Sequence, residues 1–374
     1  MSEKHLHIVA FNVPYPPDYG GIIDVFYKIK ALYDLNIKIH LHCFAYGRED
    51  TGLLNQFCHT IYIYKRNTGW RSALSYKPYI VQSRQSNELM KNLLKDDHPV
   101  LFEGLHCCCY LGDKRLSNRI KIYRESNIEH RYYFNLFKIE KNVFRKTYFL
   151  SEAVKLYFFQ KILKNVDFMF AVSEGDTNYL KRNFDPGKVY YLPSFHSNDE
   201  VNILPGRGSY ALYHGDLSVP ENHYACQYLI KKIFSRTDIP FVIAGRNPSA
   251  RLAGMVSETS NIKLIANPEV EEMNDLITNA HVHILFTFQS TGLKLKLLNS
   301  LYRGRFHVVN SNMLAGTGLD DQCMVAENSW TVLRMLNEIM DQDFTGEMIV
   351  LRKQKLMERY NNRLNAEKLV GLIF

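Results

Sequence analysis

Short apolar runs alternate with amphipathic stretches along both halves of this 374-residue chain. Strand-like runs in the first half are His5–Phe11, Ile37–Phe44, Thr60–Tyr64, Pro99–Glu103, Arg119–Tyr123 and Val166–Val172. Those in the second half are Tyr210–His214, Pro240–Ala244, Asn261–Ile265, His281–Phe286 and Arg305–Val309. Apolar residues recur at helical spacing over 21–34, 221–234, 269–279 and 292–303. This alternation predicts an α/β protein with two Rossmann-like, doubly wound parallel sheets.

An irregular, polar stretch from Pro193 to Gly208 separates the two alternating halves. The length suits two domains of ordinary size better than one core. We therefore expect an amino-terminal domain over 1–195 and a carboxy-terminal domain over 206–345. The last residues, 346–374, form a long helical pattern rich in Lys and Arg, which we expect to pack back toward the amino-terminal domain.

The first strand runs into a Pro-rich turn that ends in Gly20-Gly21, where a helix begins. In a doubly wound fold this turn lies at the carboxyl edge of the sheet, where ligands bind. Two glycines at a helix start leave bare amides, which can receive a phosphate or a sugar hydroxyl. The turn lacks the GxGxxG spacing of nicotinamide dehydrogenases. The alternative is that the glycines only punctuate a loop.

A second glycine turn, Thr291-Gly292-Leu293-Lys294, follows the strand at 281–286, and Lys296 comes two residues later. Cations are disfavoured near the positive end of a helix dipole. A bound anion would offset this unfavourable placement of Lys294 and Lys296, because helix-end amides and two ammonium groups together can hold a diphosphate. The alternative is two solvated lysines on an exposed face.

The net charge of +8 is concentrated in one segment. Between Asp113 and Lys164 there are 13 Lys and Arg residues against 5 Asp and Glu, so the rest of the chain is neutral. Aromatic residues are interleaved with these charges. The segment 114–164 either packs its aromatic residues inward as domain helices or presents them to an anionic membrane surface. Nucleic acid is not an expected partner, because no recognised binding motif is present.

Neither cysteines nor acidic residues form a metal-binding pattern. The seven cysteines include Cys107-Cys108-Cys109, but adjacent cysteines cannot close on one ion as CxxC pairs do. No Asp-x-Asp loop is present, so we expect a site that needs neither metal nor cofactor. The chain has no signal-peptide pattern and no apolar run of about 18 residues. These features predict a cytoplasmic protein, with the basic segment as a peripheral contact to the inner face of the membrane.

The two turns together resemble the retaining glycosyltransferases of the GT-B fold, in particular family 4, and the resemblance spans nearly the whole chain. In that family the amino-terminal Gly-Gly turn faces the acceptor and the donor phosphates, which assigns this role to Gly20 and Gly21. The second signature is a Glu-Gly turn, a lysine-bearing helix start, a second Glu and a later Gly. Gly292, Lys294, Lys296 and Gly304 match it. The resemblance implies two domains facing each other across a cleft.

Two positions depart from the family pattern, since the paired glutamates are replaced by Thr291 and Asn299. An Asn can still accept a hydrogen bond through its amide oxygen, but without a charge. The resemblance also assigns donor binding to Gly215, Arg246, Asn267, Thr291, Gly292, Leu293 and Asn299. It places His106 against the donor sugar, and the segment Arg124–His130 resembles an Arg-x-His-Asn-x-Glu pattern of one branch.

The function implied is transfer of a hexose from a UDP- or GDP-sugar to an acceptor hydroxyl with retention of configuration. His106, Lys294 and Lys296 would act in catalysis without a metal. The acceptor would be a glycan or a lipid-linked sugar in surface polysaccharide assembly. Two alternatives are a nucleotide-sugar epimerase of the same fold and a non-catalytic nucleotide-sugar-binding protein, the latter favoured by the loss of both glutamates.

Overall fold

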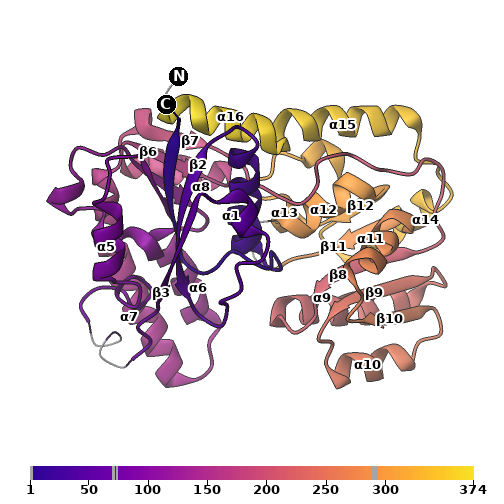
Figure 1. Ribbon diagram of the computed structural model, residues 1–374. Helices are drawn as coiled ribbons and strands as arrows, with labels where there is room; N and C mark the ends of the chain where they lie inside the picture. The colour runs from indigo at the N-terminus through magenta and orange to yellow at the C-terminus, as the bar shows by residue number, and fades with distance from the viewer. Residues whose placement is uncertain (1–2, 70–71, 73–74, 289–293) are drawn as a thin grey trace. The chain divides into compact units, whose positions relative to one another are not determined.

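The computed structural model describes residues 3–69, 72, 75–288 and 294–374 of the chain (Figure 1). The chain divides into two compact units. The first comprises Met1–Ser197 and Tyr360–Phe374, and the second comprises Asn198–Arg359. The second unit thus takes in the polar stretch from Asn198 onward. Gly206 there forms an isolated antiparallel bridge with Phe344, with N–H to O distances of 2.9 and 3.0 Å.

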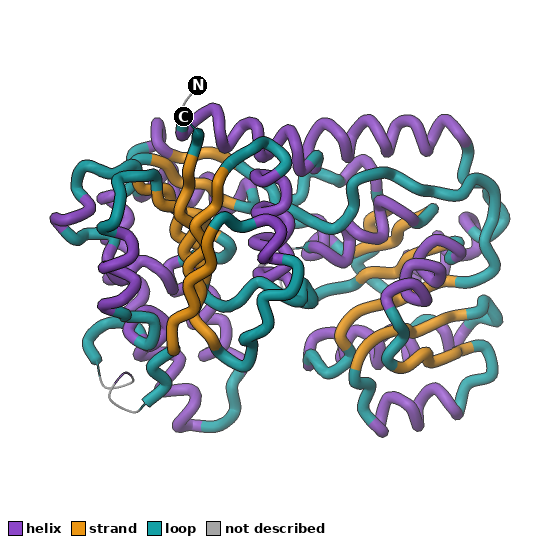
Figure 2. The backbone as a smooth tube through the Cα atoms, viewed as in Figure 1, coloured by secondary structure: helices purple, strands orange, loops and turns teal. Residues whose placement is uncertain are grey.

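The first unit is built on a seven-stranded parallel sheet of order β3-β2-β1-β4-β5-β6-β7 (Figure 2). Its strands are β1 His5–Ala10, β2 Lys38–Ala45, β3 Thr60–Lys65, β4 Val100–Glu103, β5 Lys121–Glu125, β6 Phe168–Ala171 and β7 Val189–Tyr191. Every pairing is parallel, as in β1 and β2, where His5 faces Lys38 and His7 faces His40. The strand order reverses between β1 and β4.

Helices cover both faces of this sheet, and Figure 1 shows α1 on one side and α5 on the other. They are α1 Gly20–Tyr33, α2 Leu54–Phe57, α4 Tyr79–Gln82, α5 Asn87–Leu93, α6 Glu129–Ile139, α7 Val143–Phe159, α8 Glu174–Asn183 and α16 Asn362–Ile373. A 3-10 helix, η1 Leu105–Tyr110, follows β4. Side chains of α1 and α16 share one core with Leu6, Ile8 and Ala10, whereas α5 and α8 pack in the other core with Val9. The alternation along β1 therefore sends successive side chains into opposite cores.

The second unit has a six-stranded parallel sheet of order β10-β9-β8-β11-β12-β13. Its strands are β8 Ala211–Asp216, β9 Phe241–Arg246, β10 Ile262–Ala266, β11 Val282–Leu285, β12 Phe306–Val309 and β13 Met324–Val325. Its helices are α9 Pro220–Lys232, α10 Ala250–Ser257, α11 Val270–Asn279, α12 Leu295–Arg303, α13 Ser311–Leu314, α14 Ser329–Ile339 and α15 Gly346–Tyr360. Here the strand order reverses between β8 and β11.

The predicted fold class is confirmed, because the predicted strands form two parallel sheets and helices connect successive strands along the chain. The long helical pattern over 346–372 differs in one respect, since it forms two helices, α15 and α16. The break falls at Asn361, whose side chain accepts a hydrogen bond from the Leu364 N–H at 3.0 Å and thereby caps α16. Of the helices described, none combines the length and apolar character needed to cross a bilayer.

Candidate functional site

The carboxyl edge of the second sheet brings together the residues between β8 and α9 and those at the start of α12. β8 and β11 are neighbours at the point where the strand order reverses, which is where doubly wound sheets bind ligands. β8 leads into α9, which begins at Pro220, and the chain after β11 leads into α12, which begins at Leu295. The starts of α9 and α12 therefore both lie at this edge of the second sheet.

The Lys296 side chain is turned inward at this edge. Its ammonium donates to the Asn222 Oδ1 at 2.9 Å and to the Tyr213 hydroxyl at 3.2 Å, and it lies 5.0 Å from the centre of the Tyr213 ring. Lys294 occupies the N-cap position of α12, and no acidic residue lies in the first turn. The two lysines therefore place positive charge where the helix dipole is also positive, an arrangement suited to an anion.

The Glu221 carboxylate, in the first turn of α9, raises the pKa of both of these lysines through its negative charge. It accepts hydrogen bonds from the Thr287 hydroxyl and from the Phe288 N–H, the latter at 3.0 Å. Burial lowers the pKa of Lys294 and of Lys296 to about 8 in each case, and Glu221 partly opposes this shift. Both ammonium groups are thus only marginally stable as cations, and a bound diphosphate would stabilise them.

Three other predicted donor residues lie at the ends of β8, β9 and β10. Gly215 has a φ of 155°, and a Cβ there would lie 3.2 Å from the Asn222 Nδ2, so the glycine leaves room for the Asn222 side chain. Arg246 is exposed at the end of β9, opposite Asp216 in the sheet register. Asn267 has a φ of 52° and accepts the Asn247 N–H at 2.8 Å, so its side chain holds a turn.

Asn299 lies on α12 and accepts a hydrogen bond from the Asn198 Nδ2 at 2.8 Å. Its amide oxygen is therefore engaged by the segment that enters this unit, although a carbonyl oxygen has a second lone pair. Thr291, Gly292 and Leu293 lie outside the described residues. Gly304 ends α12, and a Cβ there would lie 2.0 Å from the His283 Nε2, so a side chain is excluded by the buried imidazole.

In the first unit the glycine turn and His106 meet at the carboxyl edge, beside the reversal between β1 and β4. Gly20 begins α1, and its N-cap residue Tyr19 makes no side-chain capping bond to the amides at this end. A Cβ on Gly21 would lie 2.8 Å from the Phe11 Cζ. The Phe11 ring in turn lies 5.5 Å from the His106 ring, between ring centres. Gly20, Gly21 and His106 are therefore brought together through Phe11.

His106 is accompanied by a buried carboxyl group and a buried guanidinium. Its Nδ1 lies 3.8 Å from the Glu129 Oε1. Burial holds the pKa of His106 well below its usual range, with Arg84 and Arg66 adding to the effect, and burial raises the pKa of Glu129 to about 8. At neutral pH the imidazole is uncharged and the carboxyl group largely protonated, so this pair can donate hydrogen bonds to a sugar without a net charge.

Arg124, from the segment resembling the family pattern, is buried against α1. Its guanidinium pairs with Asp24 of α1 at 3.0 Å, and Lys28 bridges Asp24 at 3.0 Å and Glu103 at 2.7 Å. Burial would raise the pKa of Asp24, but Arg124 and Lys28 hold it at about 2. Asp24 also accepts the Phe195 N–H at 2.8 Å. This network fixes α1, and with it the glycine turn, to β4, β5 and the segment after β7.

A hollow of about 710 Å³ lies at the carboxyl ends of β2 and β3 in the first unit. Tyr46, Glu49, Lys65 and Arg66 are among the residues that line it. The Arg66 guanidinium lies 4.4 Å from the centre of the Tyr46 ring. Aromatic and charged side chains with hydrogen-bonding capacity are suited to polar ligands such as sugars, so this hollow is a candidate acceptor site.

Most of the basic segment lies in the helices α6 and α7, whose outer surface carries exposed apolar side chains. Ile139, Val143, Phe144 and Phe158 are 66%, 70%, 86% and 59% exposed. In α7 the buried residues are Glu152, Ala153 and Leu156. Most aromatic residues of this pair thus do not form the inward side of domain helices. We call the four exposed residues and the surrounding lysines and arginines the α6–α7 surface.

Several residues at these edges have no role in the sequence prediction. Tyr213 lies on β8, and Glu221 and Asn222 lie at the start of α9, where Pro-Glu-Asn at a helix start was the available signal. Arg84 donates to the Phe11 carbonyl at 2.8 Å and to the Ile80 carbonyl at 2.7 Å. It lies in no motif, so nothing in its sequence neighbourhood indicates this position.

Comparison with known proteins finds little sequence similarity but many solved structures with a similar fold. No family model matches it. An uncharacterized 44.6 kDa protein in the cps region of Klebsiella pneumoniae is 24% identical over 343 residues, covering 86% of this chain and 87% of that protein. Among solved structures, Anabaena Alr3699/HepE in complex with UDP-glucose aligns with a TM-score of 0.66 at 9% identity, over 98% of both chains. A point mutant of S. aureus TarM, solved with fondaparinux, α-GlcNAc-glycerol and UDP, aligns with 0.64 at 11% identity, over 99% of both. The chain therefore has the GT-B fold of these glycosyltransferases.

Proposed function

We propose that the protein is a retaining glycosyltransferase that moves a hexose from a nucleoside diphosphate sugar to an acceptor hydroxyl. The observation that carries the proposal is the pair of partly desolvated lysines, Lys294 and Lys296, at the start of α12 beside the strand-order reversal. The complex of HepE with UDP-glucose and that of TarM with UDP support a uridine nucleotide as donor.

In this proposal the donor diphosphate lies at the carboxyl edge of the second sheet. As the bond from the anomeric carbon to the phosphate oxygen breaks, its electron pair leaves with the diphosphate. Lys294, Lys296 and the amides at the start of α12 would stabilise the growing negative charge as positive groups fixed beside it. The acceptor oxygen bonds to the anomeric carbon on the face that the phosphate leaves, and its proton passes to a phosphate oxygen. No metal takes part.

On the first unit, Gly20 and Gly21 would seat the acceptor or the diphosphate, and neutral His106 would donate a hydrogen bond to the donor sugar. The hollow lined by Tyr46 and Arg66 would hold the acceptor glycan. Glu129 would lie beside the imidazole, because its carboxyl oxygen is 3.8 Å from the His106 Nδ1, too far for a hydrogen bond to it. Gly215, Arg246, Asn267, Thr291, Gly292, Leu293 and Asn299 remain the proposed donor-binding positions.

The experiment is a thermal-shift screen with UDP- and GDP-sugars, followed by product analysis. A donor that binds the folded state raises its melting temperature. With that donor and a glycan acceptor, NMR of the product reports whether the anomeric configuration is retained. Lys294→Ala and Lys296→Ala should each reduce kcat/KM about 100-fold or more, the range seen when one oxyanion-stabilising donor is removed. Unchanged rates would remove their assigned role.

The same assay separates the two alternatives. An epimerase converts the labelled donor without any acceptor, whereas a glycosyltransferase yields a new glycoside. A non-catalytic binding protein raises its melting temperature with a donor but neither transfers nor hydrolyses it. The loss of both family glutamates, at Thr291 and Asn299, motivates this second alternative.

We further propose that the acceptor is lipid-linked and that the α6–α7 surface rests on the anionic inner face of a membrane. Exposed aromatic side chains beside lysines and arginines are the composition of interfacial helices. The relative from a cps region supports a role in surface polysaccharide assembly. Co-sedimentation with vesicles tests this: binding to vesicles with 30% phosphatidylserine, on the order of physiological anionic content, should exceed binding to neutral vesicles.

A further inference from the structure

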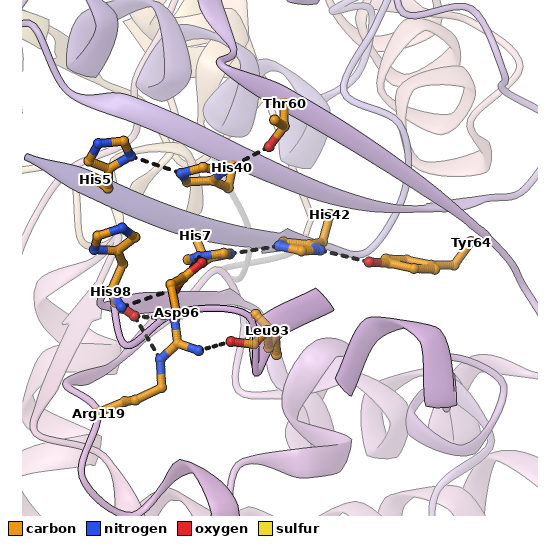
Figure 3. Close-up of polar contacts among 10 residues, drawn as sticks. All are labelled: His5, His7, His40, His42, Thr60, Tyr64, Leu93, Asp96, His98 and Arg119. Carbon is orange, nitrogen blue, oxygen red and sulfur yellow. Dashed lines mark hydrogen bonds and ion pairs between the residues drawn. The ribbon is translucent and has the colours of Figure 1, made fainter. Parts of the chain in front are cut away.

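Six histidines gather at the amino end of the first sheet, on the edge opposite the glycine turn and His106. His5 and His7 lie on β1, and His40 and His42 lie on the neighbouring strand β2. Figure 3 shows their rings in two rows, with His98 beside His5. The His5 and His98 ring centres are 4.5 Å apart, and those of His7 and His40 are 4.6 Å apart. The sixth, His59, lies edge-on to His40 at 5.2 Å between ring centres.

In one row of this cluster, both ring nitrogens of each histidine are engaged in a chain of hydrogen bonds. Asp96 accepts from the His7 Nε2 at 3.0 Å, and His7 Nδ1 faces His42 Nε2 at 2.8 Å. The His42 Nδ1 accepts from the Tyr64 hydroxyl at 2.8 Å, and the Tyr64 oxygen accepts from Asn92 at 3.0 Å. Since Asp96 is acceptor-only when ionised, each ring has one N–H donor and one acceptor in use. His7 and His42 are therefore committed to this chain.

The other row has nitrogens that converge. His5, His40 and His98 each offer one ring nitrogen, and these three nitrogens lie within 4.8 Å of one another. The His5 Nδ1 and His40 Nε2 are 2.9 Å apart. A tetrahedral zinc ion with Zn–N bonds of about 2.0–2.1 Å requires nitrogens about 3.3 Å apart. The observed separations are 2.9 Å between the His5 and His40 nitrogens and at most 4.8 Å for the other pairs, which is close to that spacing.

We propose that His5, His40 and His98 bind a divalent transition-metal ion that prefers imidazole, such as Zn²⁺, with water as the remaining ligand. Three imidazoles without a carboxylate favour zinc, copper or nickel over magnesium or calcium. His5 and His98 are partly exposed, so an ion and a water molecule can reach the site from solvent.

The surroundings of these rings resemble the second layer of a metal site. Ligating histidines donate their other ring N–H to an acceptor, which fixes the tautomer. With its Nε2 on the ion, His40 would donate through Nδ1 to the Thr60 hydroxyl, which lies at 2.8 Å. With its Nδ1 on the ion, His5 presents Nε2 to the Glu3 carboxylate at 3.7 Å. Asp96 accepts the His98 backbone N–H at 3.1 Å and forms an ion pair with Arg119 at 3.0 Å, so this carboxylate holds the His98 backbone in place.

The ion would be structural and separate from the proposed transfer reaction. Its ligands lie at the start of β1, within β2 and just before β4, and these are adjacent strands in the order β2-β1-β4. The ion would thus clamp three strands at the amino edge. The expectation of a metal-independent reaction concerns the carboxyl edges and is unaffected.

The test uses the untagged full-length chain, stripped with EDTA and desalted, because a polyhistidine tag would bind the same ions. Zn²⁺ is titrated against a chromophoric chelator at pH 7.5, and Co²⁺ is added to a second sample for its visible spectrum. We expect one equivalent of Zn²⁺, the intense visible bands of four- or five-coordinate Co²⁺, and a higher melting temperature with either ion.

His40→Gln and His98→Gln should each weaken Zn²⁺ binding about 100-fold or more. Thr60→Val, which removes only the acceptor for His40, should weaken it about 10- to 100-fold. His59→Gln is the matched control and should change the affinity less than about 3-fold. The circular dichroism and melting temperature of each metal-free variant verify its folding.

Three results would overturn the proposal. They are the absence of a stoichiometric wild-type complex, the weak pink spectrum of octahedral Co²⁺, and an affinity that falls as far in His59→Gln as in His98→Gln. Should a glutamine variant fail to fold, the stoichiometry and Co²⁺ spectrum of the wild-type chain still decide. Failure here leaves the glycosyltransferase proposal untouched, because none of these measurements uses a donor sugar.

Discussion

Replacing Lys296 with Met tests whether this lysine is kept for ligand binding at a cost in stability. Methionine is similar in length but carries no charge. In the folded protein, burial lowers the lysine pKa from 10.5 to about 8. At about 1.4 kcal/mol per pKa unit, the charged form destabilises the fold by up to about 3 kcal/mol below pH 8. The substitution removes this penalty.

The substitution also removes the hydrogen bonds to Asn222 and Tyr213, each contributing about 0.5–1.5 kcal/mol. The net expectation is a variant of equal stability or up to about 2 kcal/mol more stable at pH 7. Its kcat/KM should nevertheless fall about 100- to 1000-fold, because a preorganised charge beside the leaving diphosphate is lost. If Lys296 had only a structural role, its replacement would not lower kcat/KM while stability stayed equal or rose.

The pH dependence gives an independent measurement. A folded-state pKa of about 8 lies below the unfolded value of 10.5, so the unfolded state binds more protons between these pH values. Wild-type stability contributed by Lys296 therefore rises from pH 8 to 10.5, and the advantage of the Met variant shrinks over the same window. Wild-type kcat/KM should decline above pH 8 as the lysines lose their charge.

The assays are urea denaturation at pH 7, 8, 9 and 10 and nucleotide release with the donor identified by thermal shift. Lys263→Met, an exposed lysine on β10, is the control for loss of one charge. The reasoning is refuted if Lys296→Met keeps kcat/KM within about 3-fold of wild type. It is also refuted if the variant loses several kcal/mol of stability at pH 7.

Three further predictions concern the first unit. Asp24→Asn should lower the free energy of unfolding by about 3–5 kcal/mol in urea denaturation, because it leaves its two cationic partners buried with less compensating charge. Glu129→Gln should become more stable relative to wild type as pH rises from 4.5 to 8, because the folded-state pKa of about 8 makes wild type lose stability over that window. Phe144→Ser, which alters a side chain that is 86% exposed, should weaken binding to anionic vesicles about 10-fold in co-sedimentation, with unchanged thermal stability.

Each of these predictions has a control and a contradicting outcome. Asp34→Asn at the exposed end of α1 should be nearly neutral, and equal losses in Asp24→Asn and Asp34→Asn would contradict a buried ion network. A Glu129→Gln curve parallel to wild type from pH 4.5 to 8 would show that the carboxyl group is not shifted. Tyr76→Ser alters a side chain that is 84% exposed outside α6 and α7, and an equal loss of vesicle binding there would contradict a role for the α6–α7 surface.

Periodicity within short segments determined the fold class. Apolar β-rich runs such as His5–Phe11 and His281–Phe286 are buried on both faces in parallel sheets, so they are visible without knowledge of their neighbours. The Gly20-Gly21 turn was visible for the same reason, because α1 begins at Gly20 after the first strand. The break at Asn361 was missed because its neighbours on both sides keep helical spacing, and a single Asn cap is a weak signal.

Tertiary structure alone decided which distant side chains meet. Lys296 contacts Tyr213 because β8 and β11 are neighbours in the sheet, a pairing that no local pattern specifies. Likewise, alternate histidines at 5 and 7 and at 40 and 42 indicate one face of each strand, but the register that places His7 opposite His40 comes from strand pairing. The physical reason is that hydrophobic periodicity sets which face is buried, whereas strand order follows from packing the whole chain.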